Sequence, residues 1–392
     1  MKRYIIPFVL IGLLSVRCGN LSTEKKPMTI SLAQAPGDGF VALFNGRDFY
    51  GWNIQPDSGA WFVENGEIQC NGRNVPPYLI RTEREFENFE FYAEFKFSPD
   101  CNSGIFFHAP IPGAGRESRL GFEAQIIDDA GGPLHSGSSG SIYDVFPPKV
   151  NAMRPAGEWN QYHVLFDWPL CKIWLNGVLV QEQDFSAHPH LKYRLRRGHL
   201  GLSNHSSPVH YRNLWIKELA DQEKWVQLFN GRDLDGWEMA GAANWHVQDG
   251  QILADRGEGW LIVKNNYANF HLQTYIHNSL AATQAKIYYR WRDLHHPGYN
   301  VELFNYPLCL EYLQQYGKDI PEKVVPAFQY PWLLYQIISA DRESEIRLAG
   351  YVVASNKLLQ QTGDRIAFYR AKEDGPLIIK MVRVQPLTGE GL

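Results

Sequence analysis

The sequence predicts two all-β domains, each a sandwich of two antiparallel sheets. Three observations indicate this fold. The chain has 34 Gly, 23 Pro and 14% aromatic residues in 392 residues, a composition typical of strands joined by tight turns. Short segments of alternating apolar and polar residues recur along the chain, with Asn-Gly pairs between some of them. A long segment also occurs twice, which indicates two copies of one fold.

The N-terminus predicts an export signal over residues 1–18. Lys2 and Arg3 precede the apolar run Ile5–Leu14, which is too short to span a bilayer. Cys18 stands where a bacterial lipoprotein carries its lipidated cysteine. We therefore expect an exported protein of the periplasm or cell envelope with a lipid anchor on Cys18, and simple signal cleavage is the alternative. Residues 19–39 are polar and predict a linker.

Two opening motifs define the repeat. Leu43–Trp52 recurs as Leu228–Trp237, and Trp61–Ile68 recurs as Trp245–Ile252. The first domain is therefore expected over 40–219 and the second over 225–392, with the polar residues 220–224 as a hinge between them.

Strand signals are dense in the first copy. Asn65-Gly66 and Asn176-Gly177 each separate two apolar runs and predict hairpins with type I′ turns. Phe89–Phe97 alternates strictly, with its aromatic residues on one face. Further segments of this kind are Tyr162–Trp168, Lys172–Leu175, His199–Ser203 and Val209–Leu219. Many short strands without a comparable helical pattern predict a two-sheet sandwich.

One strand combines apolar and polar residues in an unusual way. In Gly121–Asp128, Phe122, Ala124 and Ile126 share one face, whereas Glu123 and Gln125 share the other. Burying a carboxylate and an amide without partners is costly. This face is therefore expected to be either solvated or the floor of a cleft.

Charge and cysteine content exclude some functions. The net charge is −4 and no cluster of Lys and Arg is interleaved with aromatic residues, so nucleic acid is not an expected partner. The five cysteines form no Cys-x-x-Cys pair, which argues against a zinc cluster and favours buried thiols.

Seven motifs of the first copy, in order, resemble the 3-keto-disaccharide hydrolase domain family. They are Leu43–Trp52, Asn102–Ile105, Gly121–Asp128, Gly140–Tyr143, Glu158–Asn160, Leu175–Gly177 and the stretch from His205 to Leu214. The resemblance implies tandem concanavalin-like jelly-roll sandwiches. It also implies an exported enzyme that cleaves glycosides already oxidised to a ketone at sugar carbon 3.

This chemistry needs particular groups. A ketone at carbon 3 acidifies the proton on carbon 2, so a base can remove it and the aglycone at carbon 1 can leave by β-elimination, after which water can add. The site needs a base, an electrophile for the enolate and a proton donor for the leaving oxygen. The 2-hydroxyl and 3-ketone also form a chelate for Mn²⁺, Mg²⁺ or Ca²⁺. A divalent ion is therefore an expected cofactor, and no nucleotide cofactor is expected.

The resemblance implies roles for individual residues. Glu123 is expected to act as general base or, with His108, as a metal ligand; its alternative is a solvated strand position. His205 is an acid-base candidate in a loop, and Asp128 is either catalytic or a turn former. The residues expected to bind substrate are Asn102, Ser103, Gln125, Tyr143 and Arg212.

The second copy is expected to be a degenerate partner. Aligning Gly298 on Gly121 replaces Glu123 by Asn300 and Gln125 by Glu302. Two other functions remain open for the whole chain, a non-catalytic carbohydrate-binding protein and a conventional glycoside hydrolase. The expected partners are a small carbohydrate substrate and an oxidoreductase that makes the 3-keto sugar.

Overall fold

The computed structural model describes residues 34–220, 225–278, 284–303, 330–358, 363–372 and 375–387. The export signal with Cys18, most of the linker, Cys309 and the hinge residues 221–224 lie outside these ranges, so the predictions made for them stay predictions. Among the described residues, none of the helices has the length and apolar character that crossing a membrane requires.

The larger sheet of the first copy has eight strands among the described residues. In spatial order these are β11 (Val178–Asp184), β10 (Leu170–Leu175), β9 (Asn160–Asp167), β6 (Phe89–Phe97), β13 (Pro208–Glu218), β4 (Glu67–Asn71) and β3 (Trp61–Glu64), with β1 (Val41–Ala42) paired to β13. Every pairing in this sheet is antiparallel.

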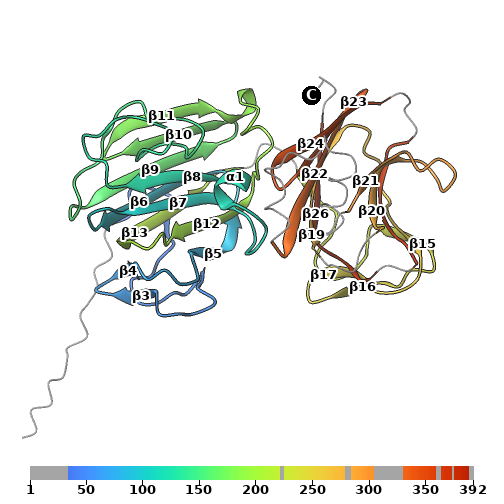
Figure 1. Ribbon diagram of the computed structural model, residues 1–392, viewed down its shortest axis with the longest axis horizontal. Helices are drawn as coiled ribbons and strands as arrows, with labels where there is room; N and C mark the ends of the chain where they lie inside the picture. Colours follow the sequence, from blue (N-terminus) through green and yellow to red (C-terminus); the bar gives the residue numbers. More distant parts are fainter. Residues whose placement is uncertain are drawn as a thin grey trace, which may run out of the picture. The chain divides into compact units, whose positions relative to one another are not determined.

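The smaller sheet of the first copy forms the second layer. Its order in the described part of the chain is β2 (Trp52–Asn53), β5 (Leu79–Phe86), β12 (Gly198–Ser203), β7 (Asn102–Ala109) and β8 (Phe122–Ile127). The short helix α1 (Glu117–Leu120) precedes β8, and the 3₁₀ turn η1 (Phe185–Ala187) follows β11. Figure 1 shows these strands in blue to green.

The core of the first copy lies between its two sheets and confirms the alternation read from the sequence. On β6, Phe89, Phe91, Ala93, Phe95 and Phe97 are buried, and they alternate with half-buried polar residues. Burying each of these phenylalanines stabilises the fold by roughly 1.5–3 kcal/mol. The two Asn-Gly hairpins also form as predicted, because both residues of each pair have positive φ angles, for example 53° at Asn176 and 81° at Gly177.

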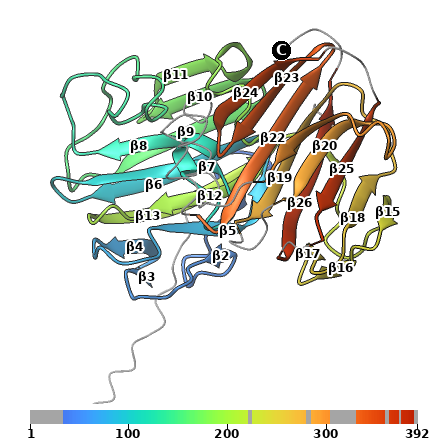
Figure 2. The same ribbon diagram turned by 45° about the vertical axis from the view of Figure 1, so that its right-hand side comes forward.

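The second copy repeats this architecture. In the described residues its larger sheet has the order β24 (Tyr351–Lys357), β23 (Glu343–Leu348), β22 (Trp332–Ala340), β19 (Phe270–His277), β26 (Leu377–Pro386), β17 (Gln251–Ala254) and β16 (Trp245–Gln248), with β14 (Val226–Gln227) on β26. Its smaller sheet has the order β15 (Trp237–Gly241), β18 (Gly259–Val263), β25 (Arg365–Arg370), β20 (Lys286–Trp291) and β21 (Tyr299–Glu302). Figure 2 shows β19, β22 and β26 of this copy in orange to red.

The order of strands is the same in both copies, and each copy encloses its own hydrophobic core. The predicted all-β fold of two sandwiches is therefore confirmed.

The duplicated opening motif is a feature of the scaffold. In the first copy the Trp52 indole Nε1 donates to the Leu43 carbonyl at 2.8 Å, and in the second Trp237 donates to Leu228 at the same distance. In each copy this hydrogen bond joins the two ends of the opening motif. The repeat of the motif therefore indicates a shared fold and carries no information about the chemistry.

Candidate functional site

A small cleft opens on the outer face of the smaller sheet of the first copy. Its volume is about 140 Å³. The lining residues come from β7, β8, α1 and three loops: Asn102, Phe106, Arg116, Glu117, Ser118, Glu123, Gln125, Tyr143 and His205. The cleft thus brings together Glu123, Gln125, Asn102, Tyr143 and His205, which the sequence had marked from four separate motifs.

The pairing of β7 with β8 forms the floor of this cleft. Phe106 is opposite Glu123, and Gly104 is opposite Gln125. The apolar residues of β8 enter the core, so the period of two along the strand turns Glu123 and Gln125 outward, as predicted. Glu123 nevertheless lies only 5% exposed, because the loops of the cleft cover it.

Gly104 explains how a carboxylate fits on this floor. A Cβ at position 104 would come within 2.2 Å of Glu123 Oε1 and within 2.9 Å of its carboxyl carbon. The third residue of the Asn-Ser-Gly motif therefore has to be glycine, because the Glu123 side chain fills the space that a larger residue would occupy.

The Gly140–Tyr143 motif holds the edge of β8. The Gly140 amide donates to the Gln125 carbonyl at 3.1 Å, and the Tyr143 amide donates to the Glu123 carbonyl at 3.0 Å. From the opposite sheet, the Tyr162 hydroxyl donates to the same Gln125 carbonyl at 2.5 Å. Glu123 and Gln125 therefore project from a backbone that is fixed on two sides.

Gln125 contacts Glu123 directly. With its amide nitrogen assigned by the surrounding hydrogen-bonding groups, Gln125 donates to the Ser103 carbonyl at 2.7 Å and to Glu123 Oε1 at 3.3 Å. It therefore orients the Glu123 carboxyl group from one side.

Burial changes the protonation of Glu123. Removal from water raises the pKa of this carboxyl to about 8; the positive charge of Arg116 opposes the shift and the negative charge of Glu117 adds to it. At neutral pH the carboxyl group is therefore mostly protonated.

Arg116 and Glu117 line the cleft, and the sequence reasoning missed both. The Arg116 guanidinium lies 5.6 Å from the ring centre of Tyr143, over its face. Glu117 is held by an ion pair with Arg81, a buried residue of β5. Both belong to the irregular stretch before Gly121, which has no periodicity; its one signal is a charged pair directly after the glycine-rich segment Gly113–Gly115.

His205 lies on the rim of the cleft, in the loop between β12 and β13. Its side chain is exposed. Contact with the surrounding protein lowers the pKa of His205, and the nearby charge of Glu117 opposes this effect. The imidazole is therefore neutral at neutral pH and accessible to solvent.

Comparison with known proteins gives the family. The sequence model of the 3-keto-alpha-glucoside-1,2-lyase-like domain matches twice, over residues 39–217 and 224–380. The chain belongs to this family. The two matches also confirm the two-copy arrangement predicted from the repeat.

Three known proteins that this chain resembles share 15–26% sequence identity with it. A 3-keto-disaccharide hydrolase of Bacteroides thetaiotaomicron is 25% identical over 231 residues, which cover 46% of this chain and 79% of that protein. The chain is also similar to a candidate glycosyl hydrolase of Parabacteroides distasonis of known structure, at 26% identity and a TM-score of 0.41, covering 46% of this chain and 95% of that one. A carbohydrate-binding module of Bacillus subtilis shows 15% identity and a TM-score of 0.31, covering 43% and 96% of the two chains.

Two residues expected in this family's site lie elsewhere. Asp128 is exposed after the end of β8, where its Oδ2 accepts a hydrogen bond from the Asp100 amide at 3.1 Å, so it is a turn residue. Ser103 points into the core, where its hydroxyl lies 2.9 Å from both the Ser203 carbonyl and the Tyr211 hydroxyl. The alternation of β7 places Ser103 on the face opposite the cleft.

His108 is also not in the cleft. Its side chain is buried against Phe89, Phe122 and Phe166, and its Nε2 lies 2.7 Å from the Glu87 carbonyl oxygen. Burial lowers the pKa of His108 to about 3. The expected metal pair of Glu123 and His108 is therefore wrong, because the two side chains leave the sheet on opposite faces.

Arg212 belongs to the other sheet. Its Nε donates to Glu94 Oε2 at 2.7 Å, and its guanidinium carbon lies 3.7 Å from the ring centre of Trp159. The expected contact of Arg212 with substrate or with Glu123 is not made, because β13 lies in the larger sheet.

The residues of the cleft do not form a metal site by themselves. Among the described residues, no three His, Cys, Asp or Glu side chains come together in a way that would hold an ion. Glu117 is already paired with Arg81. The donor set therefore does not fit an ion held by protein groups alone, and no step below depends on one.

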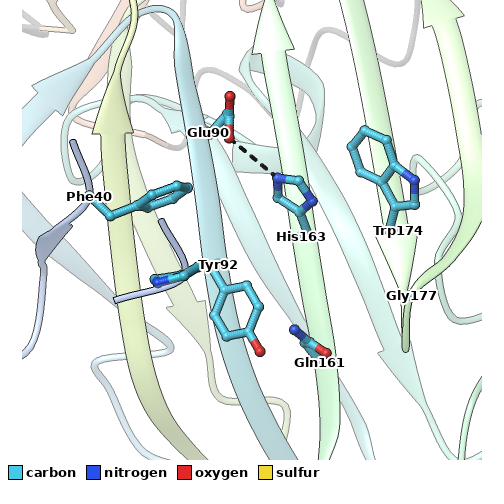
Figure 3. A pocket seen from close by; sticks show the side chains of 8 residues that line it. Phe40, Glu90, Tyr92, Gln161, His163, Trp174 and Gly177 are labelled. Carbon is cyan, nitrogen blue, oxygen red and sulfur yellow. Dashed lines mark ion pairs between the residues drawn. The ribbon is translucent and has the colours of Figure 1, made fainter. Parts of the chain in front are cut away.

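A second hollow of about 380 Å³ lies on the outer face of the larger sheet of the first copy. Figure 3 shows Tyr92, His163 and Trp174 along it. Its carboxylate, Glu90, faces His163 at 3.7 Å, and the His163 ring stacks on Trp174 at 4.6 Å. No Arg or Lys is among the described residues that line it, so it lacks an electrophile for an enolate.

Proposed function

We propose that the first domain cleaves 3-keto-glycosides by removing the carbon-2 proton, eliminating the aglycone and then adding water. One observation carries this proposal. Glu123 and His205 line the same cleft, and their surroundings move their pKa values in opposite directions. When the surroundings move the pKa values of two groups apart, one group is suited to act as the acid and the other as the base.

The electrostatics favour His205 as the base. At neutral pH its imidazole is neutral and accepts the carbon-2 proton, while the protonated Glu123 carboxyl donates to the leaving glycosidic oxygen. The carbon-2 electrons form the double bond to carbon 1 as the carbon 1–oxygen bond breaks. This assignment reverses the role of general base that the sequence reasoning had given to Glu123.

The same two residues then complete net hydrolysis. The Glu123 carboxylate takes a proton from water as the water oxygen bonds to carbon 1, and protonated His205 returns a proton to carbon 2. Both residues regain their starting protonation, and the products are the alcohol and the free 3-keto sugar.

Arg116 is the group suited to the enolate oxygen. Its guanidinium lines the cleft and is held against Tyr143. A fixed positive charge beside a developing oxyanion lowers the barrier most when water is excluded. Asn102 and Gln125 supply amide groups for the sugar hydroxyls.

A conventional glycosidase needs two working carboxyl groups. The cleft has two among its described residues, but the Glu117 carboxylate is engaged in an ion pair with Arg81, which leaves Glu123 alone for proton transfer. This arrangement supports the keto mechanism over the conventional one.

Three further predictions accompany this function. Substrate must come from an oxidoreductase that converts the carbon-3 hydroxyl to a ketone. The enzyme is expected to be exported and held in the cell envelope by a lipid anchor on Cys18. The 2-hydroxyl and 3-ketone of the substrate are expected to bring a divalent ion with them. A chelator should then abolish activity, and Mn²⁺, Mg²⁺ or Ca²⁺ should restore it.

Turnover of a chromogenic 3-keto-glucoside and of its unoxidised parent tests the proposal. We expect release of the chromophore from the ketone only. Release from the parent would indicate a conventional glycosidase, and binding of either sugar without release would indicate a carbohydrate-binding protein.

A further inference from the structure

The second domain has a hollow of about 530 Å³ on the outer face of its smaller sheet. It lies where the first domain has its catalytic cleft. Its lining side chains come from β18, β25, β20 and β21 and from the residues just before β18 and β20. Of these strands, β20 and β21 correspond to β7 and β8 of the first domain, because the strand order of the two sheets is the same.

The strand register shows which residues of β20 and β21 correspond to those of β7 and β8. Tyr288 is opposite Asn300 as Phe106 is opposite Glu123. One step along the same face, Lys286 is opposite Glu302, where the first domain pairs Gly104 with Gln125.

These substitutions remove the first domain's chemistry. Lys286 takes the place of Gly104, and its Nζ lies 3.2 Å from Glu302 Oε1. Gly104 leaves space for the Glu123 carboxyl in the first domain, whereas the second domain has the Lys286 side chain at this position. The carboxylate gained on β21, Glu302, is paired with Lys286.

Aromatic side chains take over the face instead. Register places Trp260, Tyr369 and Lys286 side by side on neighbouring strands. The Trp260 ring lies 4.5 Å from the ring of Tyr288 and 4.8 Å from that of Tyr369. All three rings are half-buried, so each keeps part of its surface open to the hollow.

Polar groups surround these rings. The Tyr369 hydroxyl donates to Glu258 Oε1 at 2.8 Å, and the Lys286–Glu302 pair lies at the other side of the hollow. The charge of Lys286 is balanced by that of Glu302. Hydrogen-bond donors and acceptors thus surround the apolar surface that the three rings form.

We propose that this hollow binds a neutral saccharide chain. A pyranose ring has an apolar face of C–H groups and a rim of hydroxyls, which match an aromatic platform bordered by hydrogen-bonding groups. Rings already held by their neighbours lose little conformational entropy when a sugar packs on them. The inference does not rest on the proposed function, because it concerns binding of unoxidised sugar by the other domain.

Binding of cellotetraose and of maltotetraose to the whole chain carrying Glu123→Gln tests this proposal. Isothermal calorimetry or ligand-observed NMR is the measurement. We expect one of the two saccharides to bind, and Trp260→Ala to weaken that binding by about tenfold or more.

Trp174→Ala is the matched control, since Trp174 is a half-buried aromatic residue on the outer face of a sheet in the first domain, beside the other hollow (Figure 3). It should leave binding unchanged. Tyr369→Ala provides a second test if the Trp260 variant fails to fold. Absence of binding by both saccharides, or equal losses in the Trp260 and Trp174 variants, would overturn the proposal.

Discussion

Gly104 and Glu123 lie on neighbouring strands so closely that the missing side chain of one provides the space for the other. A Cβ on Gly104 would stand 2.2 Å from Glu123 Oε1. The backbone of Glu123 cannot retreat, because Tyr143 and the paired strand β7 hold it. The carboxyl group is thus held at a set depth in the cleft by a residue that has no functional group of its own.

Gly104→Ala should therefore displace the Glu123 carboxyl and lower kcat by at least about tenfold in a folded protein. Gly37→Ala is the control, since nothing lies within 4 Å of the Cβ it would add. Steady-state kinetics with thermal denaturation of both variants is the measurement. Wild-type kcat in Gly104→Ala would contradict the positioning argument.

Glu123→Gln and Glu302→Gln separate the two domains. The first change removes the proposed acid and should lower kcat by about a hundredfold or more. The second affects a carboxylate paired with Lys286 in the other domain and should leave kcat within a few-fold. A large loss from Glu302→Gln in a folded protein would show that the second domain supplies chemistry.

The pH dependence of kcat/KM should be bell-shaped. Activity requires protonated Glu123, so it falls as pH rises through the pKa of about 8 of this group. It also requires neutral His205, whose pKa lies below its usual range, so it falls again in mild acid. A profile that rises continuously through pH 8 would instead assign Glu123 as the base.

Stability should change with pH in the opposite sense to an ordinary carboxylate. Between the usual pKa of 4.5 and the folded value of about 8, folded Glu123 keeps a proton that the unfolded chain releases. Folding is therefore penalised increasingly as pH rises across this range, and Glu123→Gln removes the penalty. Urea denaturation should show the variant gaining at least about 2 kcal/mol relative to wild type between pH 5 and pH 8. An equal difference at both pH values would show that the pKa of Glu123 is not raised.

Much of the fold follows from local patterns. The alternation of Phe89–Phe97 and the Asn-Gly turns specify strands and hairpins, and the repeat specifies the number of domains. The same period of two placed Glu123 and Gln125 correctly, since β8 is regular.

The misplaced residues have physical causes that the sequence does not carry. His108 would face outward by alternation, but its φ of 51° breaks the strand and turns the side chain inward. Arg212 was assigned to the cleft because sequence does not reveal which of the two sheets receives β13. Arg116 and Glu117 lie at the start of the four-residue helix α1, which is too short for a periodic pattern to predict the direction of a side chain.

Hydrolysis in D₂O tests the central claim most directly. If the carbon-2 proton is removed by solvent-exposed His205 and later returned, the 3-keto sugar product should carry one deuterium at carbon 2, measured by mass spectrometry against product incubated in D₂O with Glu123→Gln protein. Product that keeps its carbon-2 proton, with no more deuterium than this control, would contradict elimination and the assignment of the cleft.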